Sequence, residues 1–362
     1  MHILYQGLLR SPASWARVGR GYLKELARLG VDFAALQVRG FRYQGDFPLP
    51  EGVRELTRRE LAREPEVGLG FLHPPLVHRL LGGKKVNLFV WESDRVPAAW
   101  VDGLERGTDL VVVPSHFTRR ALLASGFPAR KAVVVPYGFD AQHIAGGAEA
   151  ARGERPFTFY SVVSPHRRKG IRELLSAYGM AFRKDDGVLL RLKTTYDPGA
   201  AARRFSFEID SWNQILGEFE GKAPPVELEL RTLDDAETAA LYRKADVYVQ
   251  ASWGESFGLA LLDALASGLP AIATGWGGHM DYFAESSDAL PFHLEEDAGA
   301  LYEPVPGAHV AVPDVEALAE RMRWHREHPV ESKGMGEALR QGVAGLTWGN
   351  STKRLLAVLD GA

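Results

Sequence analysis

Three cations in a row precede a predicted helix in the second half of the chain. Arg167, Arg168 and Lys169 follow the strand candidate Thr158–Val163 and stand directly before a helix candidate that starts at Gly170. The dipole at the amino end of a helix disfavours cations, whereas exposed backbone N–H groups and cations together suit an anion, above all a phosphate. The run therefore predicts an anion site. Because it is no Walker motif, a solvated basic surface is the alternative.

Two carboxylates lie eight residues apart around another strand-to-helix junction. Glu255 lies in the loop Trp253–Gly258, which follows the strand candidate Val247–Gln250, and Asp263 is the only charge of the helix candidate Leu259–Ala266. That helix is apolar all round and should be buried. A lone buried carboxylate is costly unless it has a partner, so we expect Asp263 to face a cleft and to bind something there. A satisfied structural Asp and a surface Glu are the alternative.

Glycines follow the next strand candidate, Ala271–Ala273. Gly277 and Gly278 permit positive φ angles and close approach of the backbone to a ligand. A plain tight turn would use the same residues. The pattern leaves both interpretations open.

The first half offers Glu92 and Gly7. Glu92 follows the strand candidate Val86–Val90, where an acidic group could position an acceptor hydroxyl or a sugar; a structural surface pair, Asp94–Arg95, explains the charges there equally well. Gly7, close behind the first strand, is counted among the donor-binding candidates. Its surroundings do not form the pattern GxGxxG, which weighs against a dinucleotide-binding oxidoreductase.

The elements that must position these residues alternate between short apolar runs and amphipathic stretches. Strands are predicted at His2–Tyr5, Asp32–Gln37, Val67–Phe71, Val86–Val90, Leu110–Val113, Ala132–Val135, Thr158–Val163, Leu189–Thr194, Val226–Arg231, Val247–Gln250 and Ala271–Ala273. Helices are predicted at Ser14–Leu29, Thr118–Ser125, Gly170–Phe182, Asp234–Ala245, Leu259–Ser267 and Val315–His325. This alternation is typical of parallel sheets in α/β domains, whose ligands bind at the carboxyl ends of the strands.

Two domains of similar size are expected from the chain length of 362 residues. The stretch 141–156 is rich in Ala, Gly and charge and marks the boundary. We assign residues 1–150, together with a C-terminal helix at about 345–362, to one domain and residues 151–344 to the other. The apolar face formed by Leu355, Leu356, Val358 and Leu359 should return that helix to the first domain.

Composition excludes several classes of protein. The formal net charge of −3 rules out binding to nucleic acid through bulk positive charge, and the absence of Cys rules out disulfides, Cys-ligated metals and cysteine nucleophiles. The chain opens on a strand pattern instead of a signal peptide, and no apolar run reaches the roughly 20 residues of a spanning helix. We therefore expect a cytoplasmic protein, free or peripheral at the membrane, with no transmembrane segment.

Several segments resemble the family 4 glycosyltransferases, the retaining GT-B group among glycosyl transferases group 1. The matching segments are Pro114–Thr118, Val133–Asp140, Lys169–Gly170 with Leu174, Leu175, Ala177 and Tyr178, Leu241–Val249, Ser252–Leu259, and Ala264, Ser267–Pro270 and Thr274. The block 241–274 is similar to the family's E-x7-E region almost position by position. The resemblance implies an α/β GT-B fold, with two Rossmann-like domains whose parallel sheets face each other across a cleft.

The resemblance also implies roles for individual residues. Glu255 would contact the hydroxyls of the donor sugar, Asp263 the ribose hydroxyls and Lys169 the diphosphate. The backbone of Gly277 and Gly278 would line the sugar-phosphate pocket. The loop residues of the matching block, Ser256, Phe257 and Gly258, complete the predicted donor site. Glu255, Lys169 and Glu92 are the predicted catalytic residues.

Three departures from the family pattern affect details of this assignment. The second acid of the E-x7-E pair is Asp263, whose side chain is one methylene shorter. The family's usual diphosphate Arg is Ser164 here, so Arg167 or Arg168 would replace it. A His that many relatives carry has Trp91 and Glu92 near its place, which bears on the acceptor and on the stereochemistry.

The predicted activity is transfer of a sugar from a UDP- or GDP-linked donor to an acceptor of unidentified class: a saccharide, a lipid-linked compound or a small molecule. No cofactor is implied and no nucleic acid is expected. Cations and helix amino ends aimed at the leaving diphosphate would do the work of a divalent metal. No D-x-D follows a strand, so no required metal is predicted. The alternative is a glycosyltransferase-like protein that binds nucleotide sugars without catalysis.

Overall fold

The computed structural model divides into two compact units. They are Met1–Asp140 with Leu346–Ala362, and Ala141–Gly345. The structure describes residues 1–38, 47–50, 52–57, 64–140, 155–194, 202–204, 207–209, 211–221, 224–284, 286, 288–297 and 305–361. Residues 141–154 of the predicted linker lie outside the described residues.

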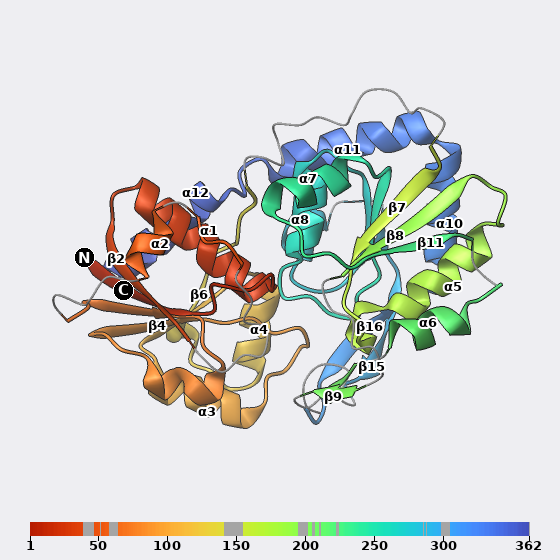
Figure 1. The fold of residues 1–362 in the computed structure, drawn as a ribbon. Coiled ribbons are helices and arrows are strands. Elements are labelled where there is room, and N and C mark those ends of the chain that lie inside the picture. Colours follow the sequence, from red (N-terminus) through yellow and green to blue (C-terminus); the bar gives the residue numbers. More distant parts are fainter. Residues whose placement is uncertain are drawn as a thin grey trace. The chain divides into compact units, whose positions relative to one another are not determined.

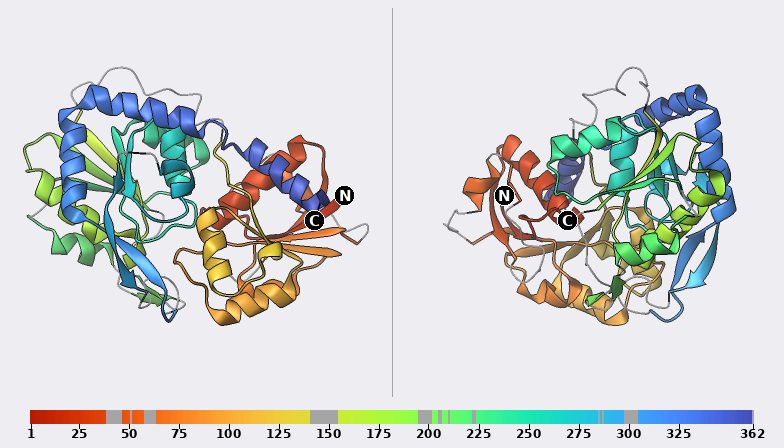
Figure 2. Two further views of the ribbon diagram at one scale, coloured as in Figure 1. Left: turned by 180° about the vertical axis from the view of Figure 1, so that it is seen from behind. Right: turned by 45° about the vertical axis from the view of Figure 1, so that its right-hand side comes forward.

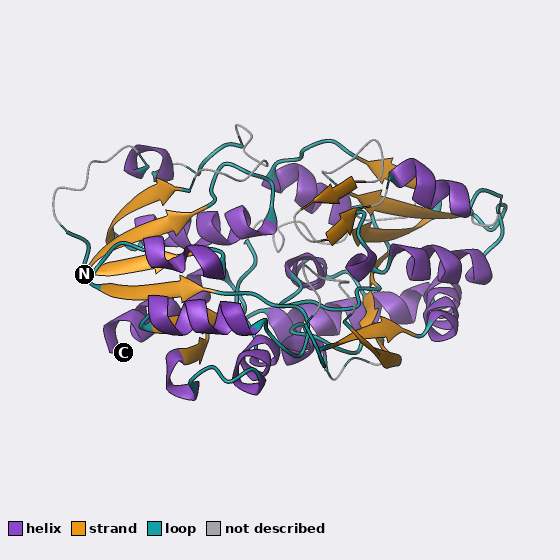
Figure 3. Ribbon diagram, turned by 90° about the horizontal axis from the view of Figure 1, so that it is seen from below, coloured by secondary structure: helices purple, strands orange, loops and turns teal. Residues whose placement is uncertain are grey.

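The first unit is built on a six-stranded parallel sheet (Figures 1 and 3). Its strands are β1 (His2–Gly7), β2 (Asp32–Gln37), β3 (Val67–Gly70), β4 (Lys84–Leu88), β5 (Leu110–Val113) and β6 (Ala132–Val134), in the order β2-β1-β3-β4-β5-β6. Its helices are α1 (Ser14–Arg28), α2 (Val53–Leu56), α3 (Ala98–Gly107), α4 (His116–Ala124) and α12 (Trp348–Gly361), with the short 3₁₀ helices η1 (Pro74–Arg79) and η2 (Ala129–Lys131). The buried strands β1, β3 and β5 are the near-continuous apolar runs that a sheet covered on both faces requires.

The last helix of the chain, α12, packs against α1 of the first unit (Figure 2). The Trp348 indole meets Tyr22 edge-on at 5.4 Å between ring centroids, and the Tyr22 hydroxyl lies 3.0 Å from the Ser351 hydroxyl. Gly21 makes room for the indole, because a Cβ there would approach the ring of Trp348 to 2.5 Å. Of the four residues assigned to the apolar face of this helix, Leu355 and Leu359 are buried, and Leu356 and Val358 are half-buried.

The second unit holds another six-stranded parallel sheet, in the order β11-β8-β7-β12-β13-β14. These strands are β7 (Phe157–Val162), β8 (Val188–Lys193), β11 (Val226–Glu229), β12 (Val247–Gln250), β13 (Ala271–Thr274) and β14 (Ala289–Leu290). Antiparallel pairs are formed by β9 (Ala202–Arg204) with β10 (Phe207–Ile209) and by β15 (Phe292–Glu296) with β16 (His309–Pro313). The helices are η4 (Arg167–Lys169), α5 (Ile171–Ala181), α6 (Trp212–Glu218), α7 (Asp235–Arg243), α8 (Leu259–Ala266), α9 (Met280–Phe283), α10 (Val315–Glu327) and α11 (Pro329–Val343). The predicted α/β fold class with two parallel sheets is confirmed.

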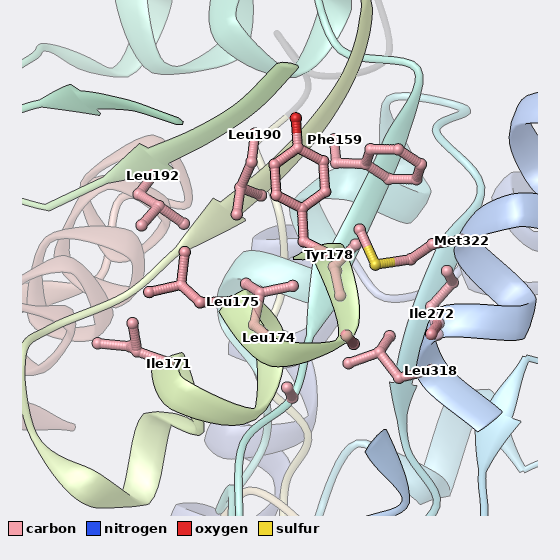
Figure 4. Packing of buried hydrophobic residues seen from close by; sticks show 14 of the residues in the cluster. Phe159, Ile171, Leu174, Leu175, Tyr178, Leu190, Leu192, Ile272, Leu318 and Met322 are labelled. Carbon is pink, nitrogen blue, oxygen red and sulfur yellow. The ribbon is translucent and has the colours of Figure 1, made fainter. Parts of the chain in front are cut away.

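The core of the second unit lies between its sheet and the helices α5 and α10 (Figure 4). Leu190 and Ile272 of the sheet, Leu174 of α5, and Leu318 and Met322 of α10 are all essentially inaccessible to solvent. Burying a side chain of this size contributes about 1.5–3 kcal/mol. On the other face of the sheet, α8 packs on β12 and β13. Helices thus pack on both faces of the sheet, and the loops at the carboxyl ends of its strands extend from this packed core.

Local sequence signals explain where the helices begin. Asp234 and Glu237 form a reciprocal capping box at the start of α7, and Asp314 caps α10 by accepting a hydrogen bond from the backbone N–H of Ala317. In the first unit, Ser115 caps α4 in the same way through Thr118. The hairpin β15–β16 was not predicted; its strand β15 is short, and most of its residues are exposed.

Candidate functional site

The cationic turn and the Glu255 loop meet at the carboxyl ends of two neighbouring strands, β7 and β12. The backbone N–H of Trp253 donates to the Arg168 carbonyl at 2.7 Å. Gly170 adopts a left-handed conformation with φ 60°, and a Cβ at this position would collide with the Ala251 carbonyl oxygen at 1.8 Å. Only glycine therefore permits this approach of the two loops, which brings Lys169 beside Glu255.

The Glu255 carboxylate is buried and is surrounded by groups that favour its charge. Lys169 Nζ donates to Glu255 Oε1, the Ser252 hydroxyl donates to the same oxygen at 3.0 Å, and Arg168 Nη1 lies 3.5 Å from it. Burial alone would raise the pKa of Glu255, but Lys169 and Arg168 outweigh burial and lower this pKa to about 2. Glu255 is therefore a fixed anion at neutral pH, and it can accept hydrogen bonds but not donate them.

The structure places the side chains of the two arginines before Lys169 in different surroundings. Arg168 is buried, and its Nη1 donates to the Gly254 carbonyl at 2.7 Å, so its charge lies against the Glu255 loop. The Arg167 side chain is 63% exposed; its guanidinium covers the Trp253 ring at 4.4 Å and lies 3.7 Å from Glu295. Only Arg168 shares the Glu255 charge with Lys169, a distinction that the sequence left open.

The predicted glycine loop lies against the backbone of Glu255. The Gly278 N–H donates to the Glu255 carbonyl at 2.6 Å. Gly277 has a φ of 121°, and a Cβ there would come within 2.9 Å of the same carbonyl oxygen. On the other side, Ser256 and Phe257 are buried, and Gly258 starts α8 with a φ of 79°. The structure therefore brings the predicted donor-site loops together.

Asp263 is placed differently from the expectation that it faces a cleft. Its relative exposure is 0% in this structure. Burial raises the pKa values of Tyr160, Tyr248 and Tyr282, and the negative charge of Asp263 adds to each of these increases. The carboxylate thus lies among buried tyrosines of the second unit, with no surface exposed to solvent.

Glu92 and Gly7 belong to the first unit. Glu92 is 7% exposed and lies beyond the end of β4. Gly7 is the last residue of β1, and a Cβ on it would meet the Tyr5 hydroxyl at 2.5 Å, as would one on Gly19 at 2.3 Å. Packing of the buried Tyr5 therefore accounts for glycine at position 7, whatever ligand role this residue has.

Sequence reasoning missed three residues of the site. Ser252 donates to Glu255, as described above; His279 is fully buried, with its Nε2 2.7 Å from the Thr274 carbonyl oxygen; and the Tyr282 hydroxyl lies 2.8 Å from the carbonyl oxygens of both Phe257 and Gly258. Two of them carried a signal: Ser252 begins the family-like segment Ser252–Leu259, and His279 directly follows the glycine pair.

Across the part of the chain that the structure describes, no three His, Asp or Glu side chains come together in a group suited to a metal ion. None of the described helices combines the length and apolar character needed to cross a bilayer.

Chemically, the site can hold an anion beside a fixed carboxylate. The ammonium of Lys169 carries three hydrogen-bond donors, one of which contacts Glu255. The amino ends of α5 and α8 lie at the same two loops and add partial positive charge. A ligand that combines phosphate oxygens with hydroxyl groups fits this set of donors and acceptors.

Comparison with known proteins agrees with this chemistry. Residues 230–341 match the family model described as glycosyl transferases group 1. The chain is 28% identical over 219 residues to D-inositol 3-phosphate glycosyltransferase of Paenarthrobacter aurescens, covering 56% of this chain and 51% of that protein. It is 26% identical over 318 residues to alpha-monoglucosyldiacylglycerol synthase of Streptococcus pneumoniae, covering 81% and 68%. The chain thus spans about half of the first relative and about two thirds of the second.

Solved structures extend the comparison to the whole fold. The crystal structure of Anabaena Alr3699/HepE in complex with UDP-glucose superposes with a TM-score of 0.69 at 14% identity, over 100% of both chains. At this identity the likeness concerns the fold alone. The chain has the GT-B fold, and its residues 230–341 match the glycosyl transferases group 1 family.

Proposed function

We propose that this protein is a retaining glycosyltransferase of family 4 that moves a sugar from a UDP- or GDP-linked donor to an acceptor. The observation that carries the proposal is the contact of the half-buried Lys169 with the buried Arg168 and Glu255 at the carboxyl ends of β7 and β12. Support comes from the match of residues 230–341 to the family model. The likeness of the fold to a protein solved with UDP-glucose guides the choice of the first donor to test.

In the proposed reaction, negative charge gathers on the diphosphate as its bond to the sugar breaks. Lys169, Arg168 and the amino end of α5 stabilise this charge without reorganising. Glu255 accepts hydrogen bonds from the sugar hydroxyls. Because its pKa is lowered to about 2, it neither protonates the leaving group nor serves as an effective general base near pH 7. Its contribution is electrostatic and orienting.

The remaining predicted residues complete the proposal. Ser256, Phe257 and Gly258 border the diphosphate, Gly277 and Gly278 the sugar. Asp263 would bind the ribose hydroxyls. Since this carboxylate is enclosed in the present structure, nucleotide binding must displace neighbouring side chains to reach it.

The first unit takes the acceptor in this proposal. Glu92 would orient an acceptor hydroxyl, and Gly7 would let the backbone approach the donor. A metal ion is not required in this scheme, because protein cations act on the diphosphate. The acceptor is a saccharide, a lipid-linked compound or a small molecule, and the protein acts in the cytoplasm or at its membrane surface.

The first experiment compares thermal stability of the protein with UDP, GDP and ADP and with their glucose conjugates, followed by hydrolysis assays on each compound that stabilises it. Lys169→Ala should weaken binding of the stabilising nucleoside diphosphate ten- to a hundredfold in calorimetry, the effect of one charge-assisted contact. Stabilisation by none of these compounds would refute the proposal. Binding without turnover, with water or any acceptor, would leave a nucleotide-sugar-binding protein. NMR of the product's anomeric centre tests retention.

A further inference from the structure

The short segment after β13 holds the loop that carries Glu255. The Gly278 N–H binds the Glu255 carbonyl at 2.6 Å, and the Tyr282 hydroxyl lies 2.8 Å from the carbonyl oxygens of Phe257 and Gly258. Residues 278–282 thus contact the backbone of the Glu255 loop at Glu255 itself and at the end of the loop that leads into α8. This loop is the one whose carboxylate faces Lys169.

His279 fixes that segment to the sheet. Its Nε2 lies 2.7 Å from the Thr274 carbonyl oxygen, at the end of β13. A carbonyl can only accept a hydrogen bond, so Nε2 carries the proton. Burial is the largest effect on the ring and lowers the pKa of His279, which keeps the imidazole neutral near pH 7. The contact is thus a single neutral hydrogen bond.

The space around these contacts is filled. A Cβ on Gly258 would approach the Tyr282 hydroxyl to 3.0 Å and the His279 Cβ to 3.2 Å, and a Cβ on Gly277 would meet the Glu255 carbonyl oxygen at 2.9 Å. His279 is fully buried. Interiors packed in this way transmit small displacements of one group to the next, so the position of α9 governs the position of the Glu255 backbone.

We propose that His279 and Tyr282 are positioning residues for Glu255: they join the loops after β12 and β13 into one clamp that sets where the carboxylate meets the donor sugar. This inference rests on the proposed function for its kinetic consequence. The clamp itself is a property of the second unit alone. Through Glu255, the clamp acts on the part of the site that is proposed to bind the sugar. Lys169 belongs to a different loop, the one after β7.

The test uses single-atom changes in the full chain. Tyr282→Phe removes only the hydroxyl and should lower kcat for hydrolysis of UDP-glucose, or of whichever donor wild type uses, about five- to tenfold, the effect of losing one neutral hydrogen bond. The affinity for the bare nucleotide should stay within twofold. Tyr178→Phe is the matched control: its hydroxyl also donates to a backbone carbonyl, that of Pro225, but it lies near the other end of α5 and should leave kcat unchanged.

The second pair of variants separates the two nitrogens of His279. Gln can place an amide N–H near the position of Nε2, and Asn places one near Nδ1. His279→Gln should therefore retain most of the wild-type kcat, and His279→Asn should lose it. Because Asn also fills less of the ring's volume than Gln, packing alone would give the same order. His279→Met separates the two explanations, since Met resembles Gln in length and volume but has no N–H: the clamp predicts that this variant loses kcat, and packing alone predicts that it retains kcat as His279→Gln does.

Hydrogen exchange gives a readout that needs no turnover. Peptides covering residues 253–259 should exchange several times faster in Tyr282→Phe and His279→Asn than in wild type, and at the wild-type rate in Tyr178→Phe. Unchanged exchange together with unchanged kcat would overturn the clamp. Equal loss of nucleotide affinity and kcat would also overturn it, since the effect would not then be confined to Glu255. Failure of wild type to bind any nucleotide, with faster exchange in the variants, would refute the proposed function while sustaining the clamp.

Discussion

Replacing Lys169 by Met should leave the Glu255 carboxylate buried without its nearest cation. In wild type, the pKa of Glu255 falls from an ordinary 4.5 to about 2, because Lys169 and Arg168 overcome the effect of burial. At about 1.4 kcal/mol for each pH unit, this difference stabilises the folded protein by about 3 kcal/mol near pH 7. Arg168 remains 3.5 Å away in the variant, so we expect Lys169→Met to cost about 2–3 kcal/mol, below the usual loss for a fully buried pair.

The cost should depend on pH in a defined direction. The pKa of Glu255 is lower in the folded than in the unfolded chain, so its stabilisation is complete above about pH 4.5 and is lost as the pH falls toward about 2. At pH 3 less than half of it remains. The destabilisation by Lys169→Met, measured by urea unfolding with tryptophan fluorescence, should therefore shrink by about half or more between pH 7 and pH 3.

A double-mutant cycle with Glu255→Gln isolates the pair. The double variant should be more stable than Lys169→Met alone, because it buries no poorly compensated charge. The pair Arg172–Glu218 serves as control: it forms two hydrogen bonds of 2.8 Å, but both side chains are more than a third exposed. Its coupling should stay below about 1 kcal/mol. A cost of Lys169→Met that is independent of both pH and Glu255 would refute the reasoning.

Four further substitutions test separate parts of the structure. Glu255→Gln should lower turnover of the intact donor at least tenfold and change the affinity for the bare nucleotide by no more than about threefold. Asp263→Asn should lower both the turnover and the nucleotide affinity. Titrations of the folded variants with the nucleotide sugar and with the nucleotide alone test this difference, and equal loss of nucleotide binding in the two variants would contradict it. Gly170→Ala should destabilise the protein by at least about 1–2 kcal/mol in urea unfolding, since Ala must adopt a positive φ and press on the Ala251 carbonyl. Trp348→Ala should cost about 3–5 kcal/mol, because the indole is buried against the first unit; a loss below about 1 kcal/mol would show that α12 contributes little there.

The sequence sufficed to predict most of the strands near the site. The segments that form β7, β12 and β13 are short apolar runs bounded by glycines or charged residues. Such a run is the sequence pattern expected of a strand that is buried on both faces. The capping residues Asp234 and Asp314 mark helix starts just as clearly. These signals are local, so they can be recognised in the sequence without knowledge of the fold.

What the sequence could not give depends on contacts between distant segments. Lys169 and Glu255 are 86 residues apart, and their pairing follows from β7 lying next to β12, which is a matter of topology. Arg167 and Arg168 are neighbours of the same chemical type, yet the turn before Gly170 sends one to Trp253 and the other to Glu255. The burial of Asp263 depends on side chains from several elements. The proposed clamp formed by His279 and Tyr282 involves α9, which is a single helical turn and too short to show a periodic pattern in the sequence.

The charge balance of the site explains why cations occupy an unfavourable place. Next to the amino end of a helix each cation loses about 0.3–1 kcal/mol to the dipole, and η4 puts Arg168 and Lys169 directly before α5. Glu255 lies against both of these cations, and Arg167 contacts Glu295 and Trp253 instead. The carboxylate of Glu255 therefore stabilises Arg168 and Lys169 in this place, and the two cations in turn lower its pKa to about 2. In the proposed function, the diphosphate of the donor would add further negative charge beside these cations and the amino ends of α5 and α8, which suit an anion.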